Sequence, residues 1–479
     1  VRYFHLLSAT ILVIGMLALP GCDSVDPVQC PLENSQVGTR RVAQDPEDVA
    51  WTFIFYLAAD NEQEAYADAT IAQLIAGTAM VENHPQILVL IDRLSEPGTE
   101  VFEVVGGQKN ALETYPEQNT ADGAVLEDFA VYALGLAEHD NVAFVMKSEG
   151  LAWRGIGRDN THDVGSDDQL MPNGALAEAL TGKGIDLLVL EGSIMAFIEV
   201  VYELRDAAPV LLATQSKVQP DGLPWKMVIE DLGARPAMTS KELGIAITDD
   251  HITYYEDKGN NGSPRLDTST NFAAMTVFDQ SYIYQVRDAH RKWAGTLWPL
   301  FDDVYNLLPH ARDLSEVGGW GEITELDYQY DIQTFMLEGL GLIAEAGMDF
   351  PELNEAVTEY LAAQDRLIVY ERNPEDGYKM KSANGLSIWY PPTWNKYETR
   401  DESDEVFGTT MYYEDPFIGL DWVTDSNWTE YLFEYFDRAD ANLAGDGIGS
   451  GGDEPPKPGL LGGGKDRRWG VHLPLVSTP

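Results

Sequence analysis

Two short segments carry the side chains that are best placed for chemistry. Glu149 follows the apolar run 142–147, and Ser193 follows the apolar run 185–190 at a turn into a helical pattern. If both runs are parallel strands, Glu149 and Ser193 lie at the carboxyl edge of a sheet, where ligands bind in such folds. A serine hydroxyl needs a base to become nucleophilic, and a carboxylate is a weak base at neutral pH. The pair alone therefore predicts a poor hydrolytic site.

The elements that would position these residues alternate between apolar runs and helical patterns, which favours βαβ units and a mostly parallel sheet. Beyond residue 238, helices with large side chains dominate, so the predicted fold class is α/β followed by a helical α+β extension. We predict strands at 52–57, 87–91, 142–147, 185–190, 210–213 and 385–390, and helices at 62–76, 126–137, 174–180, 195–205, 284–308, 328–346 and 428–436.

Several segments, in chain order, resemble the clostripain family of caspase-like cysteine peptidases. They are WTFIFYLAADN at 51–61, ILVLIDR at 87–93, SEGLAW at 148–153, EGSIMA at 191–196, GLPW at 222–225, YDI at 330–332, GLSIWYP at 385–391 and WTEYL at 428–432. The resemblance spans roughly 51–436. It implies a caspase-like three-layer sandwich at 49–237, with 238–437 as the C-terminal part of the same region.

The resemblance also locates the family's catalytic positions. Family members have a strand ending in D-H-G-x-G-W and a later one ending in D-A-C-L-M-A, which places the family histidine at Glu149 and the family cysteine at Ser193. No cysteine occurs between residues 51 and 479. His162 is the one other histidine near these strand ends. We therefore expect no intact catalytic residues and a degenerate peptidase homologue that binds or scaffolds. The alternative is an active endopeptidase that cleaves after Arg or Lys by using Ser193.

The resemblance further implies a pocket for basic side chains, with acids at Glu191 and Asp221. Two carboxylates could bind an arginine or lysine through charge-assisted hydrogen bonds. The expected partner is a peptide or protein ligand, with basic peptides favoured. The alternative is that both acids are simply solvated on a scaffold.

Metal and cofactor motifs are weak in this chain. The loop 159–168 is rich in oxygen donors, but it departs from an EF-hand because Gly165 is misplaced and no bidentate Glu follows. We expect no cofactor and leave calcium open at this loop. Nucleotide-binding and zinc-peptidase motifs are missing from the sequence.

The first 22 residues predict export. A short segment with Arg2 precedes the apolar run 6–19 and the sequence Leu-Pro-Gly-Cys at 19–22, which resembles a bacterial lipobox. Residues 1–22 are thus a predicted lipoprotein signal peptide, with lipidation at Cys22 and anchoring to the cell envelope; an ordinary signal peptide is the alternative. Residues 23–48 read as a tether, and 438–479 as a disordered Gly/Pro-rich tail.

The charge of the chain restricts its partners. The sequence has 79 acidic and 31 basic residues, a net charge of −48, with no Lys/Arg-rich run. Such a surface repels phosphate backbones and argues against nucleic-acid binding. A third reading, an adhesion or structural lipoprotein that uses its tail or later subdomain for contact, shares this acidic surface.

Overall fold

The structure, a computed structural model, describes residues 50–162, 170–218, 221–256, 273–317, 328–373, 380, 383–391, 417 and 419–445. The predicted signal peptide with Cys22, the predicted tether and the region beyond residue 445 lie outside these ranges. Within them, no helix combines the length and apolar character needed to cross a membrane.

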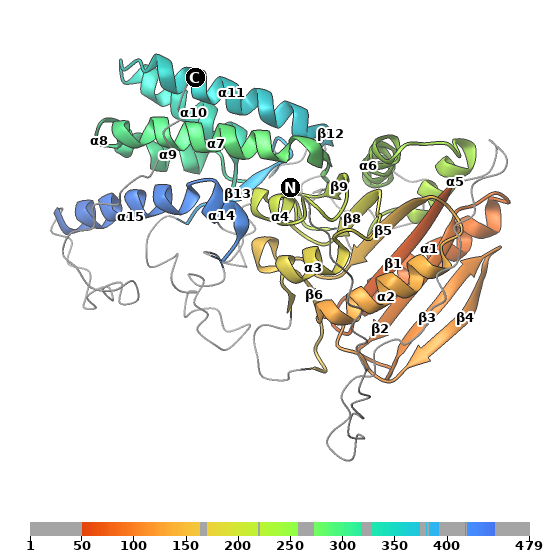
Figure 1. Cartoon of the computed structure of the whole chain (residues 1–479). Helices are drawn as coiled ribbons and strands as arrows, with labels where there is room; N and C mark the ends of the chain where they lie inside the picture. The colour runs from red at the N-terminus through yellow and green to blue at the C-terminus, as the bar shows by residue number, and fades with distance from the viewer. Residues whose placement is uncertain are drawn as a thin grey trace, which may run out of the picture.

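Among the described residues, nine strands form one central sheet in the order β12-β10-β9-β8-β5-β1-β2-β3-β4 (Figure 1). The central strands, from β9 to β2, are parallel, and antiparallel pairs complete both edges. The fold is therefore α/β around a mostly parallel sheet, as predicted. The strands are β1 (Trp51–Ala59), β2 (Gln86–Arg93), β3 (Thr99–Val105), β4 (Gln108–Tyr115), β5 (Asn141–Lys147), β8 (Leu187–Glu191), β9 (Val210–Ala213), β10 (Met275–Asp279) and β12 (Ile368–Arg372).

Helices cover both faces of this sheet and form three layers with it. Strand β1 is buried along its whole length, since apolar side chains leave it on both faces. On one face, Phe53, Phe55 and Leu57 share a core with α1, α5 and α6; on the other, Ile54 and Tyr56 share a core with α2, α3 and α4. These helices are α1 (Glu64–Met80), α2 (Gly123–Leu136), α3 (Asn173–Leu180), α4 (Ile198–Glu203), α5 (Trp225–Ala234) and α6 (Ser240–Glu256).

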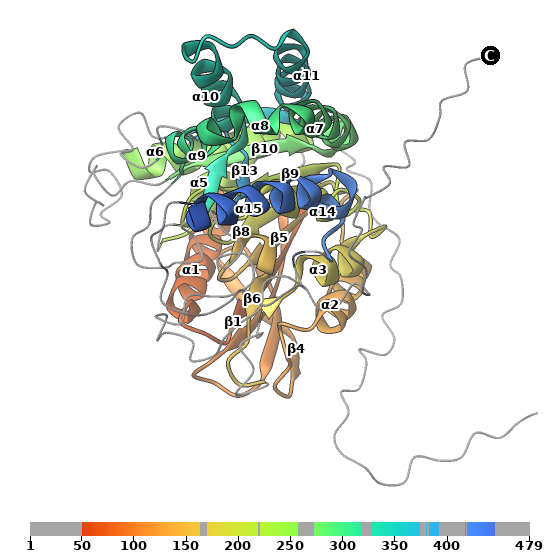
Figure 2. The same ribbon diagram turned by 90° about the vertical axis from the view of Figure 1, so that its left-hand side faces the viewer.

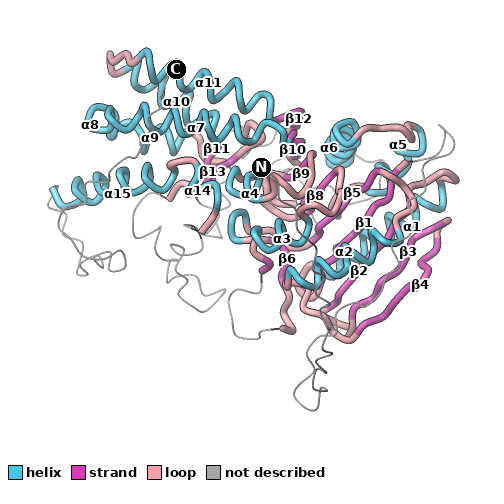
Figure 3. Tube along the Cα trace, viewed as in Figure 1, coloured by secondary structure: helices cyan, strands magenta, loops and turns pink. Residues whose placement is uncertain are grey.

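The C-terminal half is continuous with the sheet, because β10 and β12 are two of its strands. Its helices gather beyond that edge, on the side opposite β4 (Figures 2 and 3). Packed aromatic rings, among them Tyr390, Trp428 and Tyr431, fill the core between them. The elements are α7 (Ile283–Leu297), α8 (Phe301–Val304), α9 (Leu308–Leu314), β11 (Gln329–Asp331), α10 (Ile332–Glu345), α11 (Pro351–Leu367), β13 (Ser387–Trp389), α14 (Asp421–Asp425) and α15 (Trp428–Gly445).

Three predictions for this half were wrong in part. The helix expected over 284–308 is interrupted by 3-10 turns, the first of which contains a proline at its start. The helix expected from residue 328 begins only at Ile332, because Gln329–Asp331 pairs as a strand and the Asp331 side chain caps α10 by accepting a hydrogen bond from Thr334 N (2.9 Å). The helix expected over 428–436 is longer than predicted, because α15 continues to Gly445.

Candidate functional site

The strand register brings the two predicted catalytic positions together. Strands β5 and β8 are parallel neighbours with Lys147 opposite Glu191, so Glu149 and Ser193 each lie two residues beyond the same register position. Gly150 and Gly192 are in contact, since a Cβ added to Gly192 would lie 3.3 Å from Gly150 Cα, and a Cβ added to Gly150 would lie 2.6 Å from the Ser193 carbonyl oxygen. The sequence therefore placed both positions correctly at one edge of the sheet.

Ser193 lies half-buried at the turn that follows β8. Its Oγ accepts a hydrogen bond from Val218 N (3.1 Å), which is its only hydrogen bond among the described residues. The next residue, Ile194, is fully buried and has φ of +53°, a left-handed conformation that is unfavourable for a β-branched side chain. Ile194 N donates to Ser216 O (2.7 Å), so the segment after β9 holds this turn in place.

Glu149 is engaged by an arginine rather than by Ser193. One carboxylate oxygen, Oε2, lies 3.4 Å from Arg158 Nη1, and the side chain is 24% exposed. Arg158 also lies 3.9 Å from Glu62 Oε1. Burial acts to raise the pKa of Glu62, but a hydrogen bond with Glu149 and the charge of Arg158 outweigh it and lower that pKa. Arg158 therefore supplies one positive charge that both Glu149 and Glu62 approach.

Lys147 and Glu191 form an ion pair in the interior, with side chains 6% and 0% exposed. Lys147 Nζ donates to Glu191 Oε1, which also accepts from Leu223 N (3.0 Å), and Oε2 accepts from Trp225 Nε1 (2.9 Å). Lys147 thus pairs with Glu191, the acid that we expected to bind a basic side chain of a ligand. As a correction, Glu191 is a buried, fully hydrogen-bonded carboxylate, neither open to a ligand nor solvated.

Asp221 is adjacent to this ion pair through Gly222. A Cβ at Gly222 would lie 2.2 Å from Glu191 Oε1, and Gly222 has φ of +68°, which favours glycine. Asp221 is half-buried, and its Oδ2 accepts a hydrogen bond from the Tyr254 hydroxyl (3.0 Å). The predicted proximity of Glu191 and Asp221 is therefore present, with Asp221 the more accessible of the two.

Comparison with known proteins decides the family. The model of the clostripain family matches residues 55–435. The chain belongs to the clostripain family. Solved structures show the same fold, and a search of curated protein sequences returned no match.

Three structures of C11 proteases resemble this clostripain-family chain. One is a secreted C11 cysteine protease from Bacteroides thetaiotaomicron with an irreversible peptide inhibitor (18% identity, TM-score 0.57), covering 79% of this chain and 99% of the other. An inactive zymogen C11 protease from Parabacteroides distasonis has 16% identity and TM-score 0.53, with 79% and 98% covered. A secreted C11 protease from B. thetaiotaomicron, iotapain, has 14% identity and TM-score 0.53, with 71% and 93% covered. These likenesses establish the fold.

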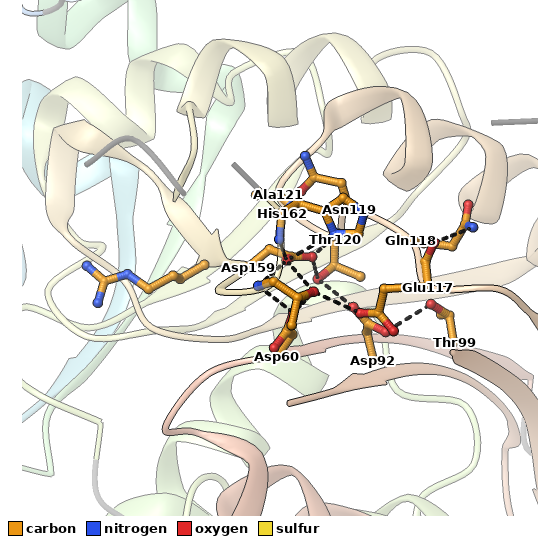
Figure 4. Close-up of polar contacts among 12 residues, drawn as sticks. Asp60, Asp92, Thr99, Glu117, Gln118, Asn119, Thr120, Ala121, Asp159 and His162 are labelled. Atoms are coloured by element: carbon orange, nitrogen blue, oxygen red, sulfur yellow. Dashed lines mark hydrogen bonds and ion pairs between the residues drawn. The ribbon is translucent and has the colours of Figure 1, made fainter. Parts of the chain in front are cut away.

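The remaining predicted residues of this clostripain-family chain lie elsewhere or outside the described ranges. The His162 ring lies 3.3 Å from Asp159 Oδ1, beside an acidic cluster at the end of β1 (Figure 4), and its backbone N donates to the same oxygen (3.0 Å). Residues 163–168 of the predicted oxygen-rich loop lie outside the described ranges. The description therefore covers only the start of this loop.

Sequence reasoning missed Lys147 and Arg158. Lys147 immediately precedes the SEGLAW motif, but its partner is identified only when β5 and β8 are aligned in register. Arg158 belongs to β6 (Ile156–Arg158), a short strand that pairs with β7 (Leu170–Met171) and has no apolar run. The only sign of the Glu149–Arg158 ion pair in the sequence was that a basic residue follows Glu149 in the same segment.

Proposed function

We propose that this clostripain-family protein binds a peptide or protein partner at the carboxyl edge of its sheet without cleaving it. The observation that carries the proposal is the pairing of Glu149 with Arg158. Because that carboxylate is engaged by a guanidinium, it is poorly suited to accept a proton from Ser193. Ser193 Oγ accepts a hydrogen bond from Val218 N, and this contact does not accept the hydroxyl proton either.

The chemistry of the family supports this proposal. A cysteine thiol, with a pKa of ~8.5, ionises readily beside an imidazole. A serine hydroxyl does not, and it needs an aligned base to attack a carbonyl carbon. The resemblance assigns the thiol and imidazole positions to Ser193 and Glu149, so both groups would be replaced at once. A peptidase fold that has lost its nucleophile and its base still has the surface at which a peptide would bind.

The partner we propose is a basic peptide segment that contacts Asp221. The net charge of −48 attracts cationic ligands at low ionic strength. Because Lys147 already pairs with Glu191, a ligand cation would reach Glu191 only by displacing this lysine. Asp221 is half-buried beside Gly222, so it is the more accessible of the two predicted pocket acids.

We also propose that the protein is exported and held at the bacterial cell envelope by a lipid on Cys22. The apolar run and Leu-Pro-Gly-Cys sequence support this, and two of the similar structures are described as secreted proteases. Detergent partitioning of cell extracts tests the anchor. The wild-type chain should enter the detergent phase, and Cys22→Ala should remain in the aqueous phase. Equal partitioning of both would contradict lipidation.

Binding and cleavage can be measured on the same sample. A fluorescein-labelled peptide with a central arginine is titrated with protein, and mass spectrometry then examines the recovered peptide. We expect intact peptide and at least about fivefold weaker binding by Asp221→Asn, a loss of roughly 1 kcal/mol or more. Asp303→Asn, an exposed acid on α8, is the charge-matched control.

The outcomes separate the alternatives. If Asp221→Asn and Asp303→Asn weaken binding equally, the peptide responds only to the overall charge of the protein, and Asp221 has no specific role. Cleaved peptide that disappears with Ser193→Ala would establish the serine-based endopeptidase instead. No binding by the wild type would leave the fold as a scaffold and refute the proposed ligand.

A further inference from the structure

The turn that carries Asp221 is held by side chains from two helices that are distant in the sequence. Asp221 is half-buried in the connection between β9 and α5. Gln73 of α1 donates from Nε2 to the Asp221 carbonyl oxygen (3.1 Å). The last turn of α6 contributes two hydroxyl groups, those of Tyr254 and Tyr255. The position of Asp221 therefore depends on how α1 and α6 pack beside the sheet.

The two tyrosines of α6 bind different groups of this turn. The Tyr255 hydroxyl donates to the Gly222 carbonyl oxygen (2.9 Å), whereas the Tyr254 hydroxyl donates to Asp221 Oδ2 (3.0 Å). Burial, followed by the charge of Asp221, raises the pKa of Tyr255 above its usual range, so this hydroxyl keeps its proton. Tyr255 thus fixes the backbone, and Tyr254 contacts the carboxylate itself.

The backbone of the turn is bound on both sides of Gly222. Gly222 has φ of +68°, and Leu223 N donates to Glu191 Oε1 (3.0 Å). The Glu191 carboxylate is in turn fixed by its buried ion pair with Lys147. Since the carbonyl groups of Asp221 and Gly222 and the amide of Leu223 are bound to side chains, the freedom that remains at Asp221 is mainly rotation of its own side chain.

The rings that carry these hydroxyls are packed against one another. The Tyr254 and Tyr255 rings meet edge to face with centroids 4.9 Å apart, and the Tyr255 ring lies 5.0 Å from the buried ring of His251. Burial lowers the pKa of His251 to about 3, so this ring brings no positive charge near Asp221 at neutral pH. The row of rings limits the movement of the Tyr254 hydroxyl and adds no competing cation.

We propose that Tyr254 is a positioning residue for Asp221, an inference that rests on the proposed binding of a basic peptide at this acid. The Tyr254 hydroxyl holds the carboxylate in one orientation before a ligand arrives. The ion pair with a ligand cation then loses less side-chain entropy when it forms. A carboxylate has about four lone-pair sites, so a hydrogen bond at Oδ2 leaves capacity for a guanidinium.

A double-mutant cycle on peptide binding tests the proposal. The full chain, Tyr254→Phe, Asp221→Asn and the double variant are each titrated against the fluorescein-labelled peptide with a central arginine. We expect Tyr254→Phe to weaken binding about threefold to tenfold, as for the loss of one hydrogen bond. In the Asp221→Asn background the same substitution should change the affinity by less than about twofold, because Tyr254 acts through Asp221.

The matched control is Tyr370→Phe. The Tyr370 hydroxyl donates to Asp249 Oδ1 (2.7 Å), so it too is a hydrogen bond from a half-buried tyrosine to a carboxylate, here one on α6. This substitution should leave the peptide affinity unchanged. Thermal melts of Tyr254→Phe and Tyr370→Phe should show similar, small decreases in Tm, so that a difference in binding between them does not arise from stability.

The outcomes separate this inference from the proposed function. Equal binding by the wild type and Tyr254→Phe, with weaker binding by Asp221→Asn, would overturn the inference and leave the proposed function intact. Tighter binding by Tyr254→Phe would overturn it too, because the hydroxyl would then compete with the ligand for Oδ2. The same loss in both backgrounds would show a contribution that does not pass through Asp221. No binding by the wild type would refute the proposed function and this inference together.

Discussion

Lys147 and Glu191 face each other in register at the carboxyl ends of β5 and β8 and form a buried ion pair. The pair lies two residues before Glu149 and Ser193, so it supports the strand ends at which we propose that a partner binds. Its carboxylate has three donors from two segments, namely Lys147 on β5 and both Leu223 and Trp225 at the start of α5. We regard it as a structural anchor of this edge.

The first prediction concerns this anchor. Lys147→Met should lower the free energy of unfolding by about 3–5 kcal/mol, because it leaves a buried carboxylate without its counter-charge. The double variant Lys147→Met with Glu191→Gln should recover much of this loss, since no unpaired charge remains. Urea denaturation measures both values.

An exposed ion pair serves as the control for that prediction. Lys226 and Glu230 are one turn apart on α5 and lie 3.2 Å apart, with side chains 41% and 35% exposed. Lys226→Met should cost less than about 1 kcal/mol. If Lys147→Met cost no more than this control, the buried pair would not be an anchor.

The second prediction concerns Gly222. Its positive φ and the 2.2 Å approach of a Cβ to Glu191 Oε1 leave no room for a side chain. Gly222→Ala should destabilise the protein by about 2 kcal/mol or more through strain and displacement of the ion pair. Gly174→Ala in α3, where a Cβ meets nothing within 4 Å, should be neutral or stabilising by up to about 1 kcal/mol. Thermal melts of the two variants give the comparison, and similar shifts would contradict it.

The third prediction is a pH dependence at Glu199. Burial raises the pKa of this carboxyl to about 8, although Trp389 N donates to its Oε1 (3.0 Å). Since the folded pKa lies above the unfolded value of ~4.3, the protonated group stabilises the fold below the unfolded pKa. That contribution is lost as pH rises through about 8.

The substitution Glu199→Gln isolates this effect. The variant should have a smaller loss of unfolding free energy between pH 5 and 9 than the wild type, by on the order of a few kcal/mol. Exposed Glu178→Gln on α3 is the control and should follow the wild-type profile. A difference between the wild type and the Glu199→Gln variant that stays constant across this pH range would exclude a protonated Glu199.

The strands that position the site were predictable because they are continuous apolar runs. Strands β1, β2, β5, β8 and β9 are buried almost throughout, and such runs are typical of parallel strands covered on both faces. The hairpin β3–β4 was missed because β4 is exposed over nearly its whole length and has no apolar pattern. Without this hairpin, the prediction also missed that Glu117 lies close to Asp60 and Asp92.

The residues of the candidate site were predictable as positions and less so as chemistry. The motifs placed Glu149 beside Ser193 and Glu191 beside Asp221, and the structure brings both pairs together. Which charges neutralise one another depends on register and on burial, neither of which a motif contains. That is why Glu191 was expected to be accessible and lies instead against Lys147.

A cleavage assay tests most directly whether this protein lacks peptidase activity. Purified protein and its Ser193→Ala variant are incubated with fluorogenic arginine and lysine reporter peptides from acidic to mildly alkaline pH, with and without calcium. We predict no turnover above background by either protein under any of these conditions. Turnover by the wild type that Ser193→Ala abolishes would contradict this prediction and make Ser193 a working nucleophile.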